Sequence, residues 1–171
     1  MTARDPLGDP EPLIRRVYAY ASYRLGEGPD AEDATSDAFE RALRYRSSFD
    51  PRKGTPAAWL IGIARRSVDE VLAYRASLTS AEPPDEPTED RDSALHIDLA
   101  RALARLDERD RELVALRYGG DLTARQIGEL LEMRTNAVEV AVHRALARLR
   151  EALVVPTAPA ARSELEPRPA P

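Results

Sequence analysis

Arginine, asparagine and histidine side chains recur along a predicted helix between residues 134 and 150. The residues off its apolar stripe are Arg134, Asn136, Glu139, His143, Arg144, Arg148 and Arg150. Arginine, asparagine and histidine can reach base edges or phosphates when a helix lies in the major groove of duplex DNA. Four arginines against one glutamate give this segment a local charge of +3 with histidine neutral. The pattern indicates nucleic-acid binding, and the alternative is a helical hairpin whose charged face is merely solvated.

Two helices joined by a tight turn position these side chains. Thr123 and Gln126 form a capping-box sequence, which predicts the start of the first helix. Glu132 to Arg134 supply the turn, and Thr135 can cap the second helix. Apolar residues at three- and four-residue spacing give each helix one buried face, namely Ile127, Leu130 and Leu131 in the first and Val138, Val142, Leu146 and Leu149 in the second. This arrangement is a helix-turn-helix.

Composition limits the remaining functional classes. The 171 residues are 43% hydrophobic and include no cysteine and only two histidines, His96 and His143. Neither histidine has the neighbours of a catalytic or metal-binding set, so we expect no enzyme activity, no metal and no cofactor. No apolar run approaches the roughly 20 residues that span a bilayer, and no leader precedes the first helix. We therefore expect a cytoplasmic protein without membrane insertion.

The net charge of −5 comes from one segment. Residues 76–94 contain six acidic residues, one arginine and three prolines, without hydrophobic periodicity. Such a segment predicts an extended acidic linker. It divides the chain into an N-terminal domain (1–75) and a C-terminal domain (95–153), followed by a proline-rich tail (154–171) that we expect to be disordered. No stretch alternates with period two, so the predicted fold is all-α.

The helices of both domains can be placed from caps and periodicity. We expect helices from Leu13 to Leu25, closed by Gly26, from an Asp30 cap to about Tyr45, and from the Thr55-Pro56 pair onward. Residues spaced for packing are Ala34, Ala38, Ala42 and Tyr45 in the second helix and Trp59, Leu60, Ile63, Ala64 and Val68 in the third, with Arg65 and Arg66 off that stripe. In the C-terminal domain we expect a helix over Leu95–Leu106 and another from Asp107 to Gly119-Gly120.

The loop between the second and third helices combines one aromatic residue with two cations. Phe49 lies just before Arg52 and Lys53. An exposed aromatic ring beside cations can stack on an unpaired base and hold its phosphate. The alternative is a surface loop with Phe49 tucked into the core, and composition alone favours that alternative.

The order of these motifs resembles the bacterial RNA polymerase sigma factors of the sigma-70 family, in particular the small extracytoplasmic-function (ECF) type. Three stretches carry the resemblance: DAEDATSDAFERALR (30–44), SFDPRKGTPAAWLIGIARR (48–66) and the segment from 103 to 153 that ends in HRALARLREAL. The resemblance as a whole extends over everything except the linker and the chain ends. The resemblance implies two helical domains that correspond to sigma regions 2 and 4.

In similar proteins the second helix binds the clamp helices of the largest polymerase subunit. The matching residues here are Asp33, Ser36 and Asp37, with a serine where glutamine is more usual. The resemblance assigns capture of the minus-ten strand to the loop and the third helix, which here means Phe49, Arg52, Lys53, Thr55, Arg65 and Arg66. Because promoter opening unstacks bases, this implication moves the balance for the loop toward DNA binding.

The resemblance assigns recognition of the minus-thirty-five element to the last helix. It places Asn136, Glu139, Val140 and His143 toward the bases and Arg134, Thr135 and Arg144 near phosphates, with Arg148 on the same basic helix. Lysine, serine and arginine are common where this chain has Glu139, Val140 and Ala141. Glutamate accepts from cytosine and valine contacts a thymine methyl group, so the departure is consistent with a different element or with weaker binding.

The sequence therefore predicts a promoter-specificity subunit that binds core RNA polymerase and promoter DNA and helps to open the duplex. An anti-sigma factor is a further partner that the resemblance allows, and the acidic linker is expected to thread the positively charged RNA path of the polymerase. One alternative is a conventional helix-turn-helix regulator that binds an operator without polymerase. Another is a helical adaptor that binds no DNA, which Glu139 supports best.

Overall fold

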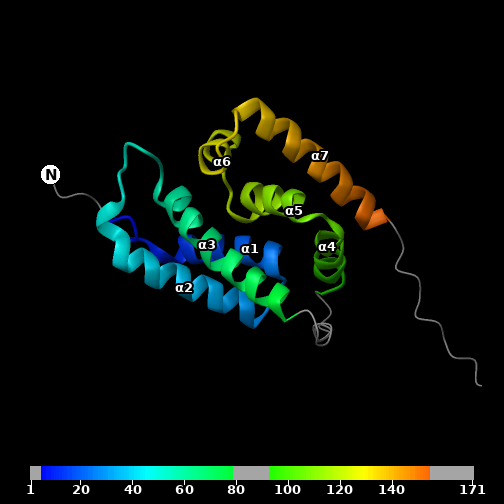
Figure 1. The fold of residues 1–171 in the computed structure, drawn as a ribbon, viewed down its shortest axis with the longest axis horizontal. Coiled ribbons are helices and arrows are strands. Elements are labelled where there is room, and N and C mark those ends of the chain that lie inside the picture. The colour runs from blue at the N-terminus through cyan, green and yellow to red at the C-terminus, as the bar shows by residue number, and fades with distance from the viewer. Residues whose placement is uncertain (1–4, 79–92, 155–171) are drawn as a thin grey trace, which may run out of the picture.

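The computed structural model describes residues 5–78 and 93–154, and its regular elements are helices (Figure 1). In chain order they are α1 (Pro10–Leu25), α2 (Pro29–Tyr45), the short 3-10 turn η1 (Arg46–Ser48), α3 (Pro56–Ser77), α4 (Ser93–Arg105), α5 (Glu108–Val114), the π-helical turn η2 (Ala115–Gly119), α6 (Ala124–Leu131) and α7 (Thr135–Val154). Strands are absent from these two ranges. The prediction of an all-α fold is confirmed.

A stripe of alanines on α2 packs in the core of the N-terminal half. Ala31, Ala34, Ala38 and Ala42 recur at three- and four-residue spacing, and none is more than 2% exposed. Small side chains let helices approach closely, so α2 lies along α3 and both pack on α1. Tyr45, which the sequence spacing grouped with these alanines, is 59% exposed, so that part of the prediction is wrong.

The helix ends of this half follow partly from their caps. Gly26 closes α1 at a φ of +86°, a left-handed conformation that favours glycine. The Thr55 hydroxyl accepts the backbone N–H of Ala58 at 3.2 Å, which confirms the predicted start of α3. The predicted Asp30 cap is wrong, because Gly28 precedes α2 and Asp30 instead accepts from the guanidinium of Arg75. The first helix also begins earlier than Leu13, at Pro10.

The C-terminal half consists of α4 to α7. Asp107 caps α5 by accepting the backbone N–H of Asp110 at 2.8 Å, as predicted. Both halves of the capping box form between Thr123 and Gln126 at the start of α6. The residues that pack α4, α5 and α7 together are Ala102, Leu103, Leu106, Val114, Ala145 and Leu149. These contacts fix α7 along one side while its opposite side faces outward.

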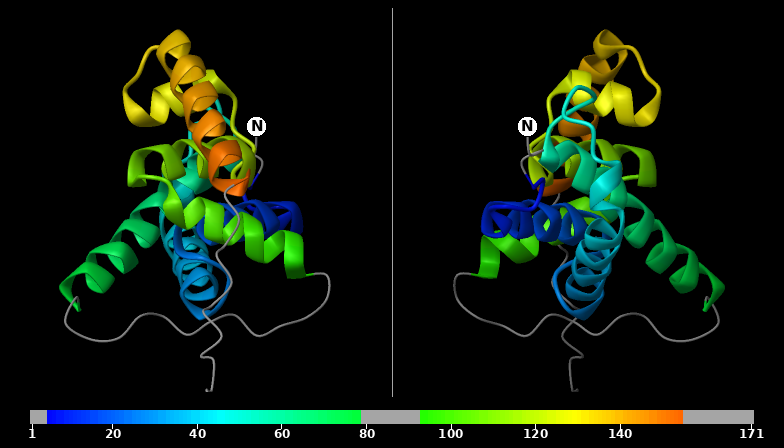
Figure 2. Two further views of the ribbon diagram at one scale, coloured as in Figure 1. Left: turned by 90° about the vertical axis from the view of Figure 1, so that its right-hand side faces the viewer. Right: turned by 90° about the vertical axis from the view of Figure 1, so that its left-hand side faces the viewer.

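The two halves share one hydrophobic core. Tyr20 and Ala21 of α1 belong to the same buried cluster as Leu113 of α5, Leu116 of η2 and Ile127 of α6. Both views in Figure 2 show the C-terminal helices lying against the N-terminal ones. The sequence predicted two halves joined by a tether, and it gave no sign of this contact.

The ends of the predicted linker and tail are helical. Helix α3 continues to Ser77 and α4 begins at Ser93, so both edges of the 76–94 segment belong to helices. Helix α7 likewise includes Val154, the first residue of the predicted tail. The rest of these two segments, residues 79–92 and 155–171, lies outside the described residues, and so does the predicted role of the linker.

Candidate nucleic-acid interface

Helix α7 presents an open polar face. Its inward side buries Val138, Val142, Ala145 and Leu149. The predicted base-facing residues Asn136, Glu139, Val140 and His143 are all exposed, as is Arg144. Within the described ranges these five side chains form no hydrogen bond or ion pair with the rest of the protein. The helix-turn-helix therefore displays its predicted recognition residues together on one accessible surface.

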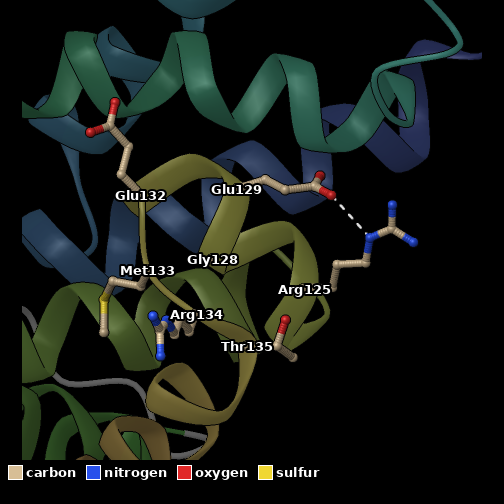
Figure 3. A pocket seen from close by; sticks show the side chains of 7 residues that line it. All are labelled: Arg125, Gly128, Glu129, Glu132, Met133, Arg134 and Thr135. Carbon is tan, nitrogen blue, oxygen red and sulfur yellow. Dashed lines mark hydrogen bonds and ion pairs between the residues drawn. The ribbon is translucent and has the colours of Figure 1, made fainter.

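The turn that aims this helix depends on close backbone packing. Glu132 ends α6 in the left-handed conformation, at a φ of +56°. A Cβ atom added to Gly128 would lie 2.6 Å from the carbonyl oxygen of Met133, so only glycine fits there. An open depression of about 530 Å³ surrounds the turn and includes the predicted phosphate contacts Arg134 and Thr135 (Figure 3).

Arg148 differs from the other predicted residues of α7. Its guanidinium pairs with the carboxylate of Asp110, which is only 6% exposed at the start of α5. That hydrogen bond raises the pKa of Arg148 above its ordinary value. Arg148 thus joins α7 to α5, whereas the residues closer to the turn remain unengaged.

The predicted minus-ten loop folds back on α3. The rings of Phe49 and Trp59 lie 5.6 Å apart between centroids and are tilted by 59°, so Phe49 is half-buried. Asp50 accepts two bonds from the Arg52 side chain, and this pairing lowers the pKa of the Asp50 carboxyl. Lys53 is exposed beside them. Phe49 is therefore neither fully exposed nor tucked into the core: one side of its ring packs on Trp59, and the rest is accessible.

A cavity of about 680 Å³ lies beside this loop. Its lining residues are Asp37, Glu40, Arg41, Arg44, Tyr45, Ser48, Ala58, Trp59, Gly62, Ile63, Arg66 and Leu130. Arg66 joins this cavity, and Tyr45 and Trp59 add aromatic surface that sequence reasoning had assigned to helix packing. Aromatic and guanidinium groups at one hollow can stack on a base and pair with a phosphate. The periodicity of the sequence placed Tyr45 in the helix packing and did not indicate that its side chain is exposed beside this cavity.

Two predicted minus-ten residues are held by the C-terminal half. The Arg65 guanidinium donates to Glu112 of α5 at 2.6 Å, and although burial opposes the charge, this bond raises the pKa of Arg65. The Thr55 hydroxyl also accepts from the side-chain amide of Gln126 in α6 at 3.2 Å. Neither partner was expected from the sequence, because Glu112 and Gln126 lie 47 and 71 residues away along the chain.

The predicted polymerase-binding residues of α2 separate into two groups. Asp33 and Ser36 are exposed, whereas Asp37 accepts from the Ser67 hydroxyl at 2.6 Å and pairs with Arg41 at 2.8 Å. Glu40 is exposed four residues beyond Ser36 and continues its side of the helix. The exposed stripe of α2 is therefore Asp33, Ser36 and Glu40, with Asp37 turned toward α3.

In residues 5–78 and 93–154 no three His, Cys, Asp or Glu side chains are grouped so that they could hold a metal ion. None of the helices described there is long and apolar enough to cross a bilayer.

The fold and the exposed face of α7 define a helix-turn-helix protein of two helical domains. A sigma-70 region 2 model matches residues 11–76, and a sigma-70 region 4 model matches residues 96–149. The chain belongs to the sigma-70 family of RNA polymerase sigma factors, within its ECF group. Each matched region coincides with one of the two helical halves described above.

Individual relatives agree with this assignment. The ECF RNA polymerase sigma factor ShbA of Streptomyces griseus is 40% identical over 168 residues, covering 85% of this chain and 84% of ShbA. The ECF sigma factor BldN of Streptomyces coelicolor is 30% identical over 150 residues, or 80% of this chain, but the match spans only 56% of BldN. The sigma factor RpoE of Bartonella quintana, solved with the anti-sigma factor NepR, shares the fold, with a TM-score of 0.69 at 20% identity and coverage of 90% of this chain and 99% of RpoE.

Proposed function

We propose that this chain is a promoter-specificity subunit of RNA polymerase that acts in the cytoplasm and performs no chemistry itself. The observation that carries the proposal is the open polar face of α7, mounted on a helix-turn-helix in a chain that also has a sigma region 2. Its relatives are described as ECF RNA polymerase sigma factors. In this function the chain binds core polymerase, recognises two promoter elements and promotes opening of the duplex.

The minus-thirty-five element is assigned to α7. Asn136, Glu139, Val140 and His143 would contact base edges, while Arg134, Thr135 and Arg144 would contact phosphates. Val140 is 51% exposed, so its methyl groups are free to contact a thymine methyl group in the major groove. The acidic Glu139 beside it favours cytosine, whose amino group is a donor.

The minus-ten element is assigned to the loop and to α3. Phe49 rests on Trp59, so its accessible face offers a rigid ring for stacking on an unpaired base. Lys53 and Arg66 are exposed cations that can hold the phosphates of that strand, and the exposed Arg52 can do so once it leaves Asp50. Thr55 and Arg65 belong to the same surface and must first leave Gln126 and Glu112.

Core polymerase is assigned to the exposed stripe of α2. Asp33 and Glu40 supply negative charge about two helical turns apart, with Ser36 between them. Such a stripe suits basic side chains on a partner helix. Asp37 shares its carboxylate with Ser67 and Arg41, so we assign it a supporting position rather than a direct contact.

The experiment is reconstitution with core RNA polymerase and a library of promoter sequences. We expect the chain to co-elute with core enzyme and to direct initiation at a common pair of promoter elements. Asp33→Arg should abolish co-elution, whereas the matched variant Asp98→Arg, an exposed position on α4, should not. Failure to associate with core enzyme would refute the proposal, and tight duplex binding without it would instead support an operator-binding regulator.

A further inference from the structure

Three arginines join helices α4, α5 and α7 in a closed ring. Arg111 of α5 donates to three backbone carbonyl oxygens at the end of α4, at 2.9–3.0 Å. Arg105, the last residue of α4, donates to the carbonyl oxygen of Ala152 in α7 at 2.9 Å. Arg148 of α7 donates in turn to the carboxylate of Asp110 in α5. Helices α4 and α5 both contact α7 (Figure 1), and each of the three helices gives one guanidinium to the next.

The ion pair between Arg148 and Asp110 is anchored on the α5 side. Asp110 is 6% exposed and lies in the first turn of α5, where the positive end of the helix dipole favours a carboxylate. A buried carboxylate is costly to leave without a partner, and Arg148 supplies one from α7. Because guanidinium and carboxylate groups bind in a defined geometry, the pair fixes one point of α7 relative to α5.

The pair lies far along α7 from the proposed recognition residues. At about 1.5 Å per residue, Asn136 is about 18 Å along the helix axis from Arg148. The apolar contacts of α7 near Arg148 come from Ala145 and Leu149, and hydrophobic contacts have no preferred direction. A tilt of about 10° at Arg148 would move the Asn136 end by about 3 Å, close to the roughly 3.4 Å between stacked base pairs.

We propose that Asp110 and Arg148 are positioning residues for recognition of the minus-thirty-five element: the pair fixes the direction of α7, and Arg105 and Arg111 hold the helices on which it is built. The identity of the DNA element rests on the proposed function, whereas the direction of α7 does not. Arg148 then acts through its carboxylate partner and not through a DNA phosphate. Loss of the pair should change the spacing of promoter elements that the chain accepts.

Substitutions of the pair separate positioning from direct DNA contact. Asp110→Asn removes a negative charge, so electrostatics alone predicts tighter DNA binding, whereas lost positioning predicts weaker recognition of the minus-thirty-five element. Arg148→Met keeps the stem of the side chain without its charge, and Arg148→Lys keeps a cation that can pair with the carboxylate. Arg150→Met is the matched control, because Arg150 is exposed on the same helix and forms no ion pair within the described ranges.

The first measurement uses the free chain. The chain has no cysteine, so Arg109→Cys on α5 and Ala137→Cys on α7 accept spin labels at exposed positions. We expect one narrow distance between the labels in the parent, in Arg148→Lys and in Arg150→Met. Asp110→Asn and Arg148→Met should give a shifted or broader distribution. Neither DNA nor polymerase is needed, so this result does not depend on the proposed function.

The second measurement is initiation with core polymerase from promoters whose minus-thirty-five element is intact or scrambled and whose spacers differ by single base pairs. We expect Asp110→Asn and Arg148→Met to lower the preference for the intact element at least about fivefold, which is roughly 1 kcal/mol, and to accept a neighbouring spacer length. Arg148→Lys should restore the preference of the parent, and Arg150→Met should keep it.

The outcomes that overturn the proposal are distinct from loss of stability. Asp110→Asn leaves no buried charge unpaired, so it decides the test if Arg148→Met does not fold. The proposal is overturned if Asp110→Asn increases initiation, if it leaves the label distances unchanged, or if the variants lose initiation equally from intact and scrambled promoters. If the parent itself does not initiate, the proposed function fails, and the label distances still decide whether the pair sets the direction of α7.

Discussion

The proposed recognition face of α7 and the proposed functional side chains of the N-terminal half differ in whether other residues of the protein bind them. The side chains of Asn136, Glu139 and Arg144 are exposed and form no hydrogen bond or ion pair within the described residues. Arg65 and Asp37, in contrast, are held by carboxylate or hydroxyl partners. Both sets come from motifs of the same family, so the motif alone does not decide whether a side chain is available.

This difference has an energetic consequence for binding. An unpaired side chain of α7 such as Arg144 loses only water when it meets DNA, whereas Arg65 must also give up its bond with Glu112. Hydrogen bonds to charged groups contribute about 1.5–3 kcal/mol, which is large enough to change an affinity by tenfold or more. DNA binding by the exposed face of α7 therefore depends on the turn that holds this helix. DNA binding by the engaged surface, the side chains of the N-terminal half that are already bonded within the protein, depends on release of partners such as Glu112.

Loss of the turn should have the largest effect on the open face. In Gly128→Ala the added methyl carbon would lie 2.6 Å from the Met133 carbonyl oxygen, so the turn must shift. We expect a destabilisation of about 2 kcal/mol, within the range for an overpacked site. Chemical denaturation measures it. Gly54→Ala is the control, since nothing lies within 4 Å of its added carbon. Equal stability of the two variants would contradict the role of the turn.

Charge reversal on the open face should come next. Arg144→Glu removes a proposed phosphate contact and adds a repelling carboxylate, so initiation that depends on the minus-thirty-five element should fall at least about tenfold. The salt dependence of binding should flatten by about 0.9 for the lost contact. Arg101→Glu on α4 carries the same charge change at another exposed position. If both variants lose activity equally, the effect is net charge and not the recognition face.

The elements of both surfaces could largely be predicted from local signals. Thr55, Asp107 and the Thr123–Gln126 pair start their helices as expected because a cap depends only on residues three positions apart. The exposed face of α7 followed from its apolar period. Asp30 misled the same reasoning, since a proline and a flexible glycine start α2 instead and leave its carboxylate to Arg75.

What the sequence could not predict is the contact between the halves. Arg24 stands on the buried face of α1, and its partners Glu108 and Glu112 lie 84 and 88 positions further along the chain. No periodic pattern couples such distant residues. Phe49 shows the same limit, because its half-buried position depends on Trp59 of a neighbouring element.

The conformation of Glu132 allows a smaller test of the turn. This residue holds a φ of +56°, which costs a non-glycine residue roughly 1 kcal/mol. Glu132→Gly should therefore stabilise the chain by up to about 1 kcal/mol while leaving the α7 face in place. Glu129→Gly, the same substitution inside α6, should destabilise it by about 1 kcal/mol. Thermal unfolding of both variants measures the two effects. If Glu132→Gly lowered the stability of the chain as Glu129→Gly does, the turn would carry no strain.

The smallest effect is expected on the engaged surface, at the exposed pair that orients Asp37. Arg41 donates to Glu70 at 2.9 Å, which lowers the pKa of that carboxyl, but the Glu70 side chain is 62% exposed. Glu70→Gln should therefore cost only about 0.5 kcal/mol near neutral pH. Because the folded pKa is lowered, the contribution is present above the unfolded pKa and disappears as the pH falls through the folded one. Denaturation of both proteins across this range should show the difference closing in acid; a constant difference would mean that Glu70 acts through packing and not through its charge.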